Sequence, residues 1–138
     1  MVNYYAILGC AILSMIVGFT WYGPLFGKKW MEIIGADMTN KAQMEEGMKK
    51  AIPLYGIQFL LSLFQIYVLA GLIAWYPSVS GLTISLWIYA GFILPTTAGS
   101  AMWSNGPRST SAWSRFLIQA GAQLVNAILF GIILGIYR

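Results

Sequence analysis

Four long apolar runs constrain the fold of this chain more than any other feature of its sequence. They cover approximately residues 2–23, 52–76, 82–103 and 113–137, and Arg115 is the single charged residue inside them. Because an α-helix rises about 1.5 Å per residue, each run is long enough to cross a hydrocarbon core of roughly 30 Å. A helix also satisfies its own backbone hydrogen bonds, as the bilayer interior demands. The sequence therefore predicts an all-α membrane protein with four transmembrane helices in one domain, 1–138.

The overall composition supports a lipid environment. Of the 138 residues, 59% are hydrophobic and 9% are charged, and the mean hydropathy is +0.71. Soluble domains are about one quarter charged, and a chain this short cannot hide so much apolar side chain in one water-facing core. The first run has no Lys or Arg before it and is followed by Trp-Tyr-Gly-Pro. We therefore interpret it as a retained helix and not as a cleaved signal peptide.

The stretch WYGPLFGKKW, residues 21–30, is typical of a membrane exit. Trp and Tyr favour the headgroup level, Gly23 and Pro24 are expected to end the helix, and the two lysines then lie near lipid phosphates. The sequence WYP at 75–77 repeats the pattern. The predicted interface anchors are Trp21, Tyr22, Lys28, Lys29, Trp30, Trp75, Tyr76, Arg108 and Arg115.

The distribution of cations predicts the orientation. Seven of the eight lie in or beside the segments 24–51 and 104–112, and Arg138 is the one that does not. Because flanking Lys and Arg are retained in the cytoplasm, we expect both segments there and both termini on the other side of the cell inner membrane. The net charge of +4 then reflects mainly the cations that set the orientation of the helices in the membrane. We predict no nucleic-acid surface.

The segment 24–51 is expected to be an amphipathic helical loop. Trp30, Ile33 and Ile34 have helical spacing, and Asn40 with Gln43 resembles a capping box. Two Glu–Lys pairs at i, i+4 favour a second amphipathic helix that leads into the second run, where Pro53 is expected to kink the chain without stopping it. Four of the seven methionines lie in this segment. Apolar packing explains them better than copper binding does, because the chain has no His and one remote Cys.

The residues most used in catalysis and metal binding are scarce. The chain has no His, Cys10 is its single cysteine, and no Asp or Glu lies inside a predicted span. This argues against a disulfide, a metal site or cofactor, a proton-coupled pump and most intramembrane enzymes. One enzymatic alternative stays open, since Arg108 and Arg115 together can hold a lipid phosphate.

Polar residues form two stripes inside the spans. Gln58, Ser62 and Gln65 share one face of the second helix, and Gln119, Gln123 and Asn126 share one face of the fourth. An unpaired amide costs several kcal/mol in hydrocarbon, so both faces are expected to meet protein or water. Two interpretations remain open: hydrogen bonds between helices, which we favour, and the lining of a polar cavity or pore.

Two further patterns concern helix packing. In the third run, Pro95 predicts a kink at which Thr96, Thr97 or a water satisfies the carbonyl one turn earlier. Small residues recur at four-residue spacing in Cys10-Ser14-Gly18 and Ala127-Gly131-Gly135. Such faces allow close helix contacts, within the chain or, for the second set, with another molecule.

Several of these motifs together resemble a known family. Asn3-Tyr4, Gly18, the WYGPLFGKxW block, GFILPTT and the glycine-rich last helix are similar to a bacterial family of small multi-pass membrane proteins, a domain of unknown function. The likeness covers most of the chain, and the block after the first helix is its most specific part. The resemblance implies this topology and transfers no activity or site residue.

These observations favour a non-enzymatic integral membrane protein that acts through helix packing. It is expected to be a homo-oligomer or an accessory subunit, with the lipid bilayer and itself or other membrane subunits as partners. The alternative is a passive channel or facilitator for a small polar solute or ion, lined by the Gln and Asn stripes.

Overall fold

The regular structure of the chain is helical throughout the residues that the computed structural model describes, 2–34, 41–105 and 110–138. The elements in chain order are α1 (Tyr4–Thr20), η1 (Trp21–Leu25, a π-helix), α2 (Gly27–Ile34), α3 (Lys41–Trp75), α4 (Gly81–Ile88), η2 (Tyr89–Ile93, a π-helix), α5 (Leu94–Asn105) and α6 (Thr110–Ile136). Four stretches in these ranges are long and apolar enough to cross a membrane, namely Tyr4–Leu25, Lys41–Trp75, Gly81–Trp103 and Trp113–Ile136. The prediction of an all-helical protein with four such helices is confirmed.

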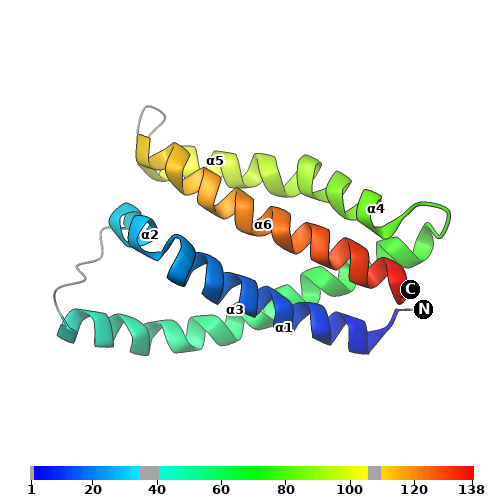
Figure 1. The fold of residues 1–138 in the computed structure, drawn as a ribbon, viewed down its shortest axis with the longest axis horizontal. Helices are drawn as coiled ribbons and strands as arrows, with labels where there is room; N and C mark the ends of the chain where they lie inside the picture. Colours follow the sequence, from blue (N-terminus) through cyan, green and yellow to red (C-terminus); the bar gives the residue numbers. More distant parts are fainter. Residues whose placement is uncertain (1, 35–40, 106–109) are drawn as a thin grey trace.

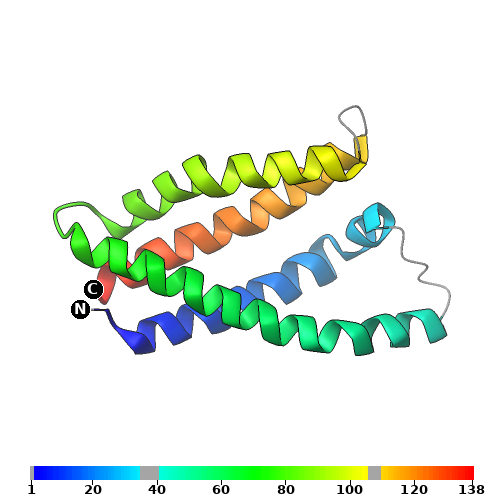
Figure 2. The same cartoon turned by 180° about the vertical axis from the view of Figure 1, so that it is seen from behind.

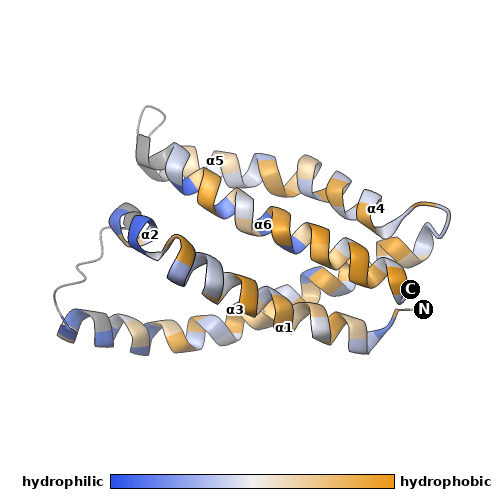
Figure 3. Cartoon of the chain, in the orientation of Figure 1, coloured by the Kyte–Doolittle hydropathy of each residue, from blue (hydrophilic) through white to orange (hydrophobic). Residues whose placement is uncertain are grey.

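The long helices run side by side and give the bundle two different ends (Figures 1 and 2). Both termini and the turn between α3 and α4 lie at one end, which we call the terminal end. At the opposite end lie α2 and the first turns of α3, which carry all five lysines; we call it the basic end. Figure 3 shows hydrophilic residues gathered there, whereas hydrophobic residues cover most of the helices between the two ends. The lysines of the chain therefore gather at one end of the bundle.

The membrane-exit stretch is more helical than the sequence predicts. The expected end at Gly23-Pro24 is wrong, because the helix continues as η1 through Leu25 with Pro24 inside it. The Phe26 amide donates to the Trp21 carbonyl at 3.0 Å, which is the i to i+5 bond of a π turn. A π turn is wider than an α turn, so it accommodates a proline that lacks the N–H and crowds the preceding turn.

The described residues of the 24–51 segment include α2 and the first turns of α3. The expected interfacial helix corresponds to α2, and the expected second amphipathic helix is continuous with the second apolar run in α3. Pro53 lies inside α3 without ending it, and Glu46 pairs with Lys50 at 3.4 Å on its exposed face. Asn40 lies outside the described residues, as do the side chains of Ile33 and Ile34.

Small residues bring α4 and α6 into close contact. A Cβ on Gly81 would lie 2.5 Å from the Gly131 carbonyl oxygen and 2.7 Å from the Gly135 Cα, and one on Gly131 would lie 2.8 Å from the Leu82 backbone. The Ser85 hydroxyl donates to the Ala127 carbonyl at 2.6 Å across the same contact. We call Gly81, Ser85, Ala127, Gly131 and Gly135 the glycine seam. The small-residue face of α6 is thus used within the chain.

Apolar side chains fill the bundle at its terminal end. This terminal core consists of Ala6, Ile7, Cys10 and Ala11 from α1, Ile66, Leu69, Ala70 and Ile73 from α3, and Phe130 and Leu134 from α6. Arg138 closes the same end, because its Nη1 donates to the Val79 carbonyl at 2.7 Å and to the Ile73 carbonyl at 3.3 Å. These bonds satisfy carbonyls at and just after the end of α3, which have no partner within that helix.

Candidate functional site: a polar cavity inside the bundle

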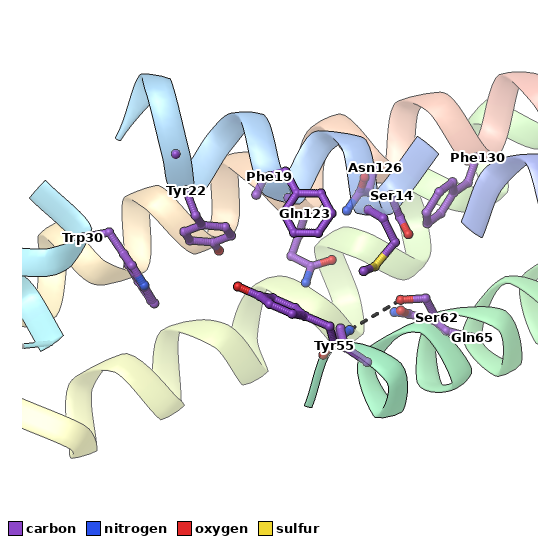
Figure 4. A pocket seen from close by; sticks show the side chains of 15 residues that line it. Ser14, Phe19, Tyr22, Trp30, Tyr55, Ser62, Gln65, Gln123, Asn126 and Phe130 are labelled. Carbon is purple, nitrogen blue, oxygen red and sulfur yellow. Dashed lines mark hydrogen bonds between the residues drawn. The ribbon is translucent and has the colours of Figure 1, made fainter. Parts of the chain in front are cut away.

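A cavity of about 530 Å³ lies between α1, α3 and α6 (Figure 4). Its lining comes from three helices and from η1 and α2: Ser14, Met15, Gly18, Phe19, Tyr22, Gly23, Trp30, Tyr55, Gln58, Ser62, Gln65, Ala122, Gln123, Asn126 and Phe130. In Figure 4, Trp30 marks one end of the cavity and Phe130 the other. Because Trp30 belongs to the basic end and Phe130 to the terminal core, the cavity runs from the basic end toward the middle of the bundle. We call it the amide cavity.

The two predicted polar stripes meet at this cavity. Gln58, Ser62 and Gln65 line it from α3, and Gln123 and Asn126 line it from α6. Ser62 and Asn126 each lie about halfway along the apolar part of their helix, so the polar lining reaches membrane depth. Gln119, the third member of the α6 stripe, does not line the cavity, although its side chain is half-buried.

The amides of the two stripes do not bond to each other. In the described part of the chain, no hydrogen bond joins an α3 amide to an α6 amide, and the bond from Gln58 Nε2 to Ser62 Oγ, at 3.4 Å, stays within α3. Asn126 Oδ1 is buried and has no partner among the described residues. Within the described chain, the two stripes therefore border one cavity and make no hydrogen bond to each other.

Aromatic rings surround the part of the cavity nearer the basic end. Phe19 of α1 and Tyr55 of α3 meet edge to face with ring centroids 5.5 Å apart, and Tyr22 of η1 meets Trp30 of α2 at 4.8 Å. The Arg115 guanidinium lies over the Trp30 ring, 5.5 Å from its centroid, in the arrangement of a cation–π contact. These contacts link α1 to α3 and hold α2 beside the opening.

The α1 wall of the cavity is open because it carries glycine and a serine that bonds to its own helix. A Cβ added at Gly18 would meet nothing within 4 Å, so the space beside it is empty. The Ser14 hydroxyl donates to the Ala11 carbonyl at 2.7 Å. The small-residue face Cys10-Ser14-Gly18 is therefore divided: Cys10 is buried in the terminal core, and Ser14 and Gly18 border the cavity.

Two aromatic residues fix the position of α6 beside the cavity. Trp21 Nε1 donates to the Ile118 carbonyl at 2.8 Å, and the Tyr89 hydroxyl donates to the Ala120 carbonyl at 2.8 Å. Each of them is the first residue of a π-helix. The Trp21 ring lies against Gly121, where an added Cβ would come 2.7 Å from Cζ2. Trp21 is therefore a contact between helices, and its N–H bonds to a backbone carbonyl of α6.

Comparison with known families gives a match over nearly the whole chain. A family model described as "Protein of unknown function (DUF1761)" matches residues 5–135. The chain belongs to this family. The predicted resemblance to a domain of unknown function is thereby confirmed. No curated protein and no solved structure matches the chain.

The remaining predicted anchor residues in this DUF1761 member lie at the ends of the bundle. Trp75 and Tyr76 are exposed at the terminal end, and Lys28 and Lys29 are exposed at the basic end. Arg108 lies outside the described residues.

In the third candidate span, the hydroxyls of Thr96 and Thr97 donate to the carbonyls four residues earlier, at 2.6 and 2.7 Å. Those are the carbonyls of residues 92 and 93, and the π-helix η2 ends directly before Leu94-Pro95.

The cavity offers hydrogen bonds and ring faces, and its lining contains no charged side chain. The described residues also contain no group of three or more His, Cys, Asp or Glu placed to hold a metal.

The sequence predicted the polar stripes, but it did not indicate that Tyr22, Tyr55 and Gly18 line the cavity. It also did not indicate that Tyr89 and Ser85 form hydrogen bonds between helices. Tyr89 and Ser85 carried a usable signal, because a buried hydroxyl inside an apolar span needs a partner.

Proposed function

We propose that the protein is a non-enzymatic facilitator that admits small, uncharged, hydrogen-bonding molecules into the membrane through the amide cavity. The observation that carries this proposal is that five polar residues of two stripes face one cavity, while Asn126 Oδ1 is buried without a partner in the described chain. A buried acceptor at membrane depth is costly unless water or a solute donates to it. Because Asn126 borders the cavity, a rotation of its side chain would bring this oxygen to water there, and a solute with hydroxyl or amide groups can replace the water.

The lining supports selection for uncharged molecules. Amide side chains both donate and accept hydrogen bonds, so they match hydroxyl and amide groups of a solute. An ion would lose its hydration at the deep end, where no lining side chain has the opposite charge. The lining also lacks a nucleophile paired with a general base, which supports binding and passage over catalysis.

The shape of the cavity supports a carrier-like passage over an open pore. Phe130 belongs both to the cavity wall and to the terminal core. Because the terminal core closes the deep end, a solute that crosses the whole membrane requires a movement of α1 or α3 against α6. The rate of passage is therefore expected to saturate with solute concentration.

The experiment that tests this function is glycerol uptake by vesicles containing the purified protein, followed by stopped-flow light scattering. Uptake is expected to exceed that of protein-free vesicles, and Gln123→Leu should reduce the excess about tenfold, since the solute then loses its bonds to α6. Gln119→Leu is the matched control, because Gln119 belongs to the same stripe but does not line the cavity. Wild-type vesicles that take up glycerol no faster than empty ones would contradict the proposal.

We also propose a location in the cell inner membrane, with the basic end in the cytoplasm and both termini on the other side. Five lysines at the basic end support this orientation. In a Cys10→Ser background, Ser78→Cys should react with a membrane-impermeant thiol reagent in intact cells, and Glu45→Cys should react only after permeabilisation. The reverse labelling pattern would overturn the orientation.

Helix packing with a second copy or another membrane subunit is a second candidate function. It is favoured by one observation: Gln58 and Gln65 are exposed along α3, inside a candidate membrane span. A partner helix that covers them would satisfy their amides. Blue-native electrophoresis of gently solubilised membranes tests this role. A strictly monomeric protein that is active alone would rule it out.

A further inference from the structure

A second cavity lies on the other side of the amides. It has a volume of about 270 Å³ and lies between α3, α4, η2 and α6. Apart from Ser85 and three shared amides, its lining is apolar: Phe64, Val68, Leu69, Leu72, Ile88, Ile93, Ala127 and Phe130. We call it the apolar cavity. Its composition suits a hydrocarbon chain, whereas that of the amide cavity suits a polar group.

The two cavities share one wall. Gln65, Gln123, Asn126 and Phe130 line both of them. Gln65 and Gln123 make no side-chain hydrogen bond to the described residues, so no bond of this kind fixes their rotamers. The two cavities therefore meet at side chains that no hydrogen bond of this kind holds in place in the described chain.

The two cavities face different surroundings. The lining of the amide cavity includes Gly23 and Trp30, which lie toward the basic end. The apolar cavity is bordered by Phe64 and Val68 of α3, whose side chains are 68% and 46% exposed within a candidate membrane span. The amide cavity therefore extends toward the basic end, and the apolar cavity is bordered by side chains that are exposed along a candidate membrane span.

From this arrangement we infer that the molecule bound is an uncharged amphiphile. Its polar end lies in the amide cavity beside Gln65, Gln123 and Asn126, and its alkyl chain lies in the apolar cavity. This inference rests on the proposed function and specifies its substrate class. A polar end between Gln65, Gln123 and Asn126 has its donors and acceptors matched, while the chain removes the apolar lining from water.

A glycerol ether with an octyl chain that ends in a photoreactive diazirine tests the inference directly. With the protein in lipid vesicles, labelling of α3 residues 64–72 is expected to saturate as the probe concentration rises. An excess of unlabelled octylglycerol should reduce it about tenfold, since the two compete for one site. Leu117 is the internal control, because it is 67% exposed on α6 and borders neither cavity. Its labelling should rise linearly, as random contact with lipid requires.

Two variants test the polar end and the apolar end of the proposed site independently. Gln123→Leu removes a polar contact, and Val68→Trp fills the apolar cavity from its exposed edge; both are expected to abolish the saturable labelling. Leu61→Trp is matched to the second variant, because Leu61 is 58% exposed on α3 and lines neither cavity. It should leave the labelling unchanged. An octyl phosphate probe, which carries charge, should label about tenfold less, because no lining side chain neutralises it.

Linear labelling of 64–72, parallel to that of Leu117, would overturn the inference. If vesicles with the same protein still take up glycerol, only the assignment of an amphiphile as the substrate is wrong, and the proposed function stands. If neither saturable labelling nor glycerol uptake is found, the proposed function fails as well. Saturable labelling that responds to both variants supports the inference whatever the rate of glycerol uptake.

Discussion

Helix α6 packs closely against α4 on one side and borders a cavity on the other. Toward α4, α6 presents Ala127, Gly131 and Gly135, and the backbones approach so closely that an added methyl group would overlap with them. Toward α1 and α3 it presents Gln123 and Asn126, and a cavity of about 530 Å³ remains. Both sides contain polar atoms, but Ser85 of the seam is bonded across to α6, whereas Asn126 Oδ1 is not bonded in the described chain.

This difference indicates which side is structural and which is available for binding. Membrane helices associate through close van der Waals contact and short interhelical hydrogen bonds, and the glycine seam has both. On the cavity side, the amides of α3 and α6 make no hydrogen bond to one another in the described chain, and α6 is held there by the Trp21 bond to the Ile118 carbonyl and by the terminal core. The seam therefore carries the stability of the α4–α6 pair, and we propose that the cavity side carries the function.

The largest effect is expected from a methyl group in the seam. Gly131→Ala should lower the free energy of unfolding by about 1–3 kcal/mol, because the Cβ would overlap the Leu82 backbone, which cannot move without separating α4 from α6. Unfolding in mixed micelles measures this loss. Gly71→Ala is the control, since an added Cβ there meets nothing within 4 Å. Equal stability of the two variants would contradict the role of the seam.

A larger side chain in the cavity is expected to affect uptake and not folding. Gly18→Leu fills the open wall of the amide cavity without a backbone clash, so glycerol uptake should fall about tenfold while stability changes by less than about 1 kcal/mol. Gly9→Leu makes the same change on the same helix beside open space outside both cavities. If Gly9→Leu blocks uptake equally, the cavity is not the path.

Replacing the unpartnered amide is expected to separate stability from function. Asn126→Leu removes a buried acceptor that has no protein donor in the described chain, so the free energy of unfolding should stay the same or rise by about 1 kcal/mol. Saturable binding of the octylglycerol probe should be lost. Thermal unfolding and photolabelling of the same sample give both values. A clear loss of stability would mean that Asn126 serves to join helices.

The smallest expected effect is that of pH. The lining of the amide cavity contains no Asp, Glu, His, Lys, Arg or Cys, so it holds none of the groups that usually titrate between about pH 5.5 and 8.5. The rate of glycerol uptake should therefore change less than about twofold across this range, whereas a proton-coupled carrier would show a steep dependence. A steep profile would point to a titrating group outside the lining.

The sequence predicted the helices well because apolar length and charge position determine where a chain can cross a bilayer. It also located the residues of both stripes, since helical spacing alone places Gln58, Ser62 and Gln65 on one face. Their environment was not predictable, because spacing says nothing about the distance between α3 and α6. The inward role of Trp21 was missed for a similar reason: a tryptophan near a helix end is typical of the interface, and only the position of Gly121 on α6 shows where its ring fits.

The central claim is that α6 presents a wet, accessible face to the amide cavity at membrane depth. Thiol reactivity tests it most directly, because a cysteine reacts with a water-soluble methanethiosulfonate only where water allows the thiolate to form. In a Cys10→Ala background, Gln123→Cys is expected to react at least about tenfold faster than Leu124→Cys, its exposed neighbour on α6 that lines neither cavity. Added octylglycerol should slow the reaction at position 123. Equally slow reaction at both positions would contradict the account.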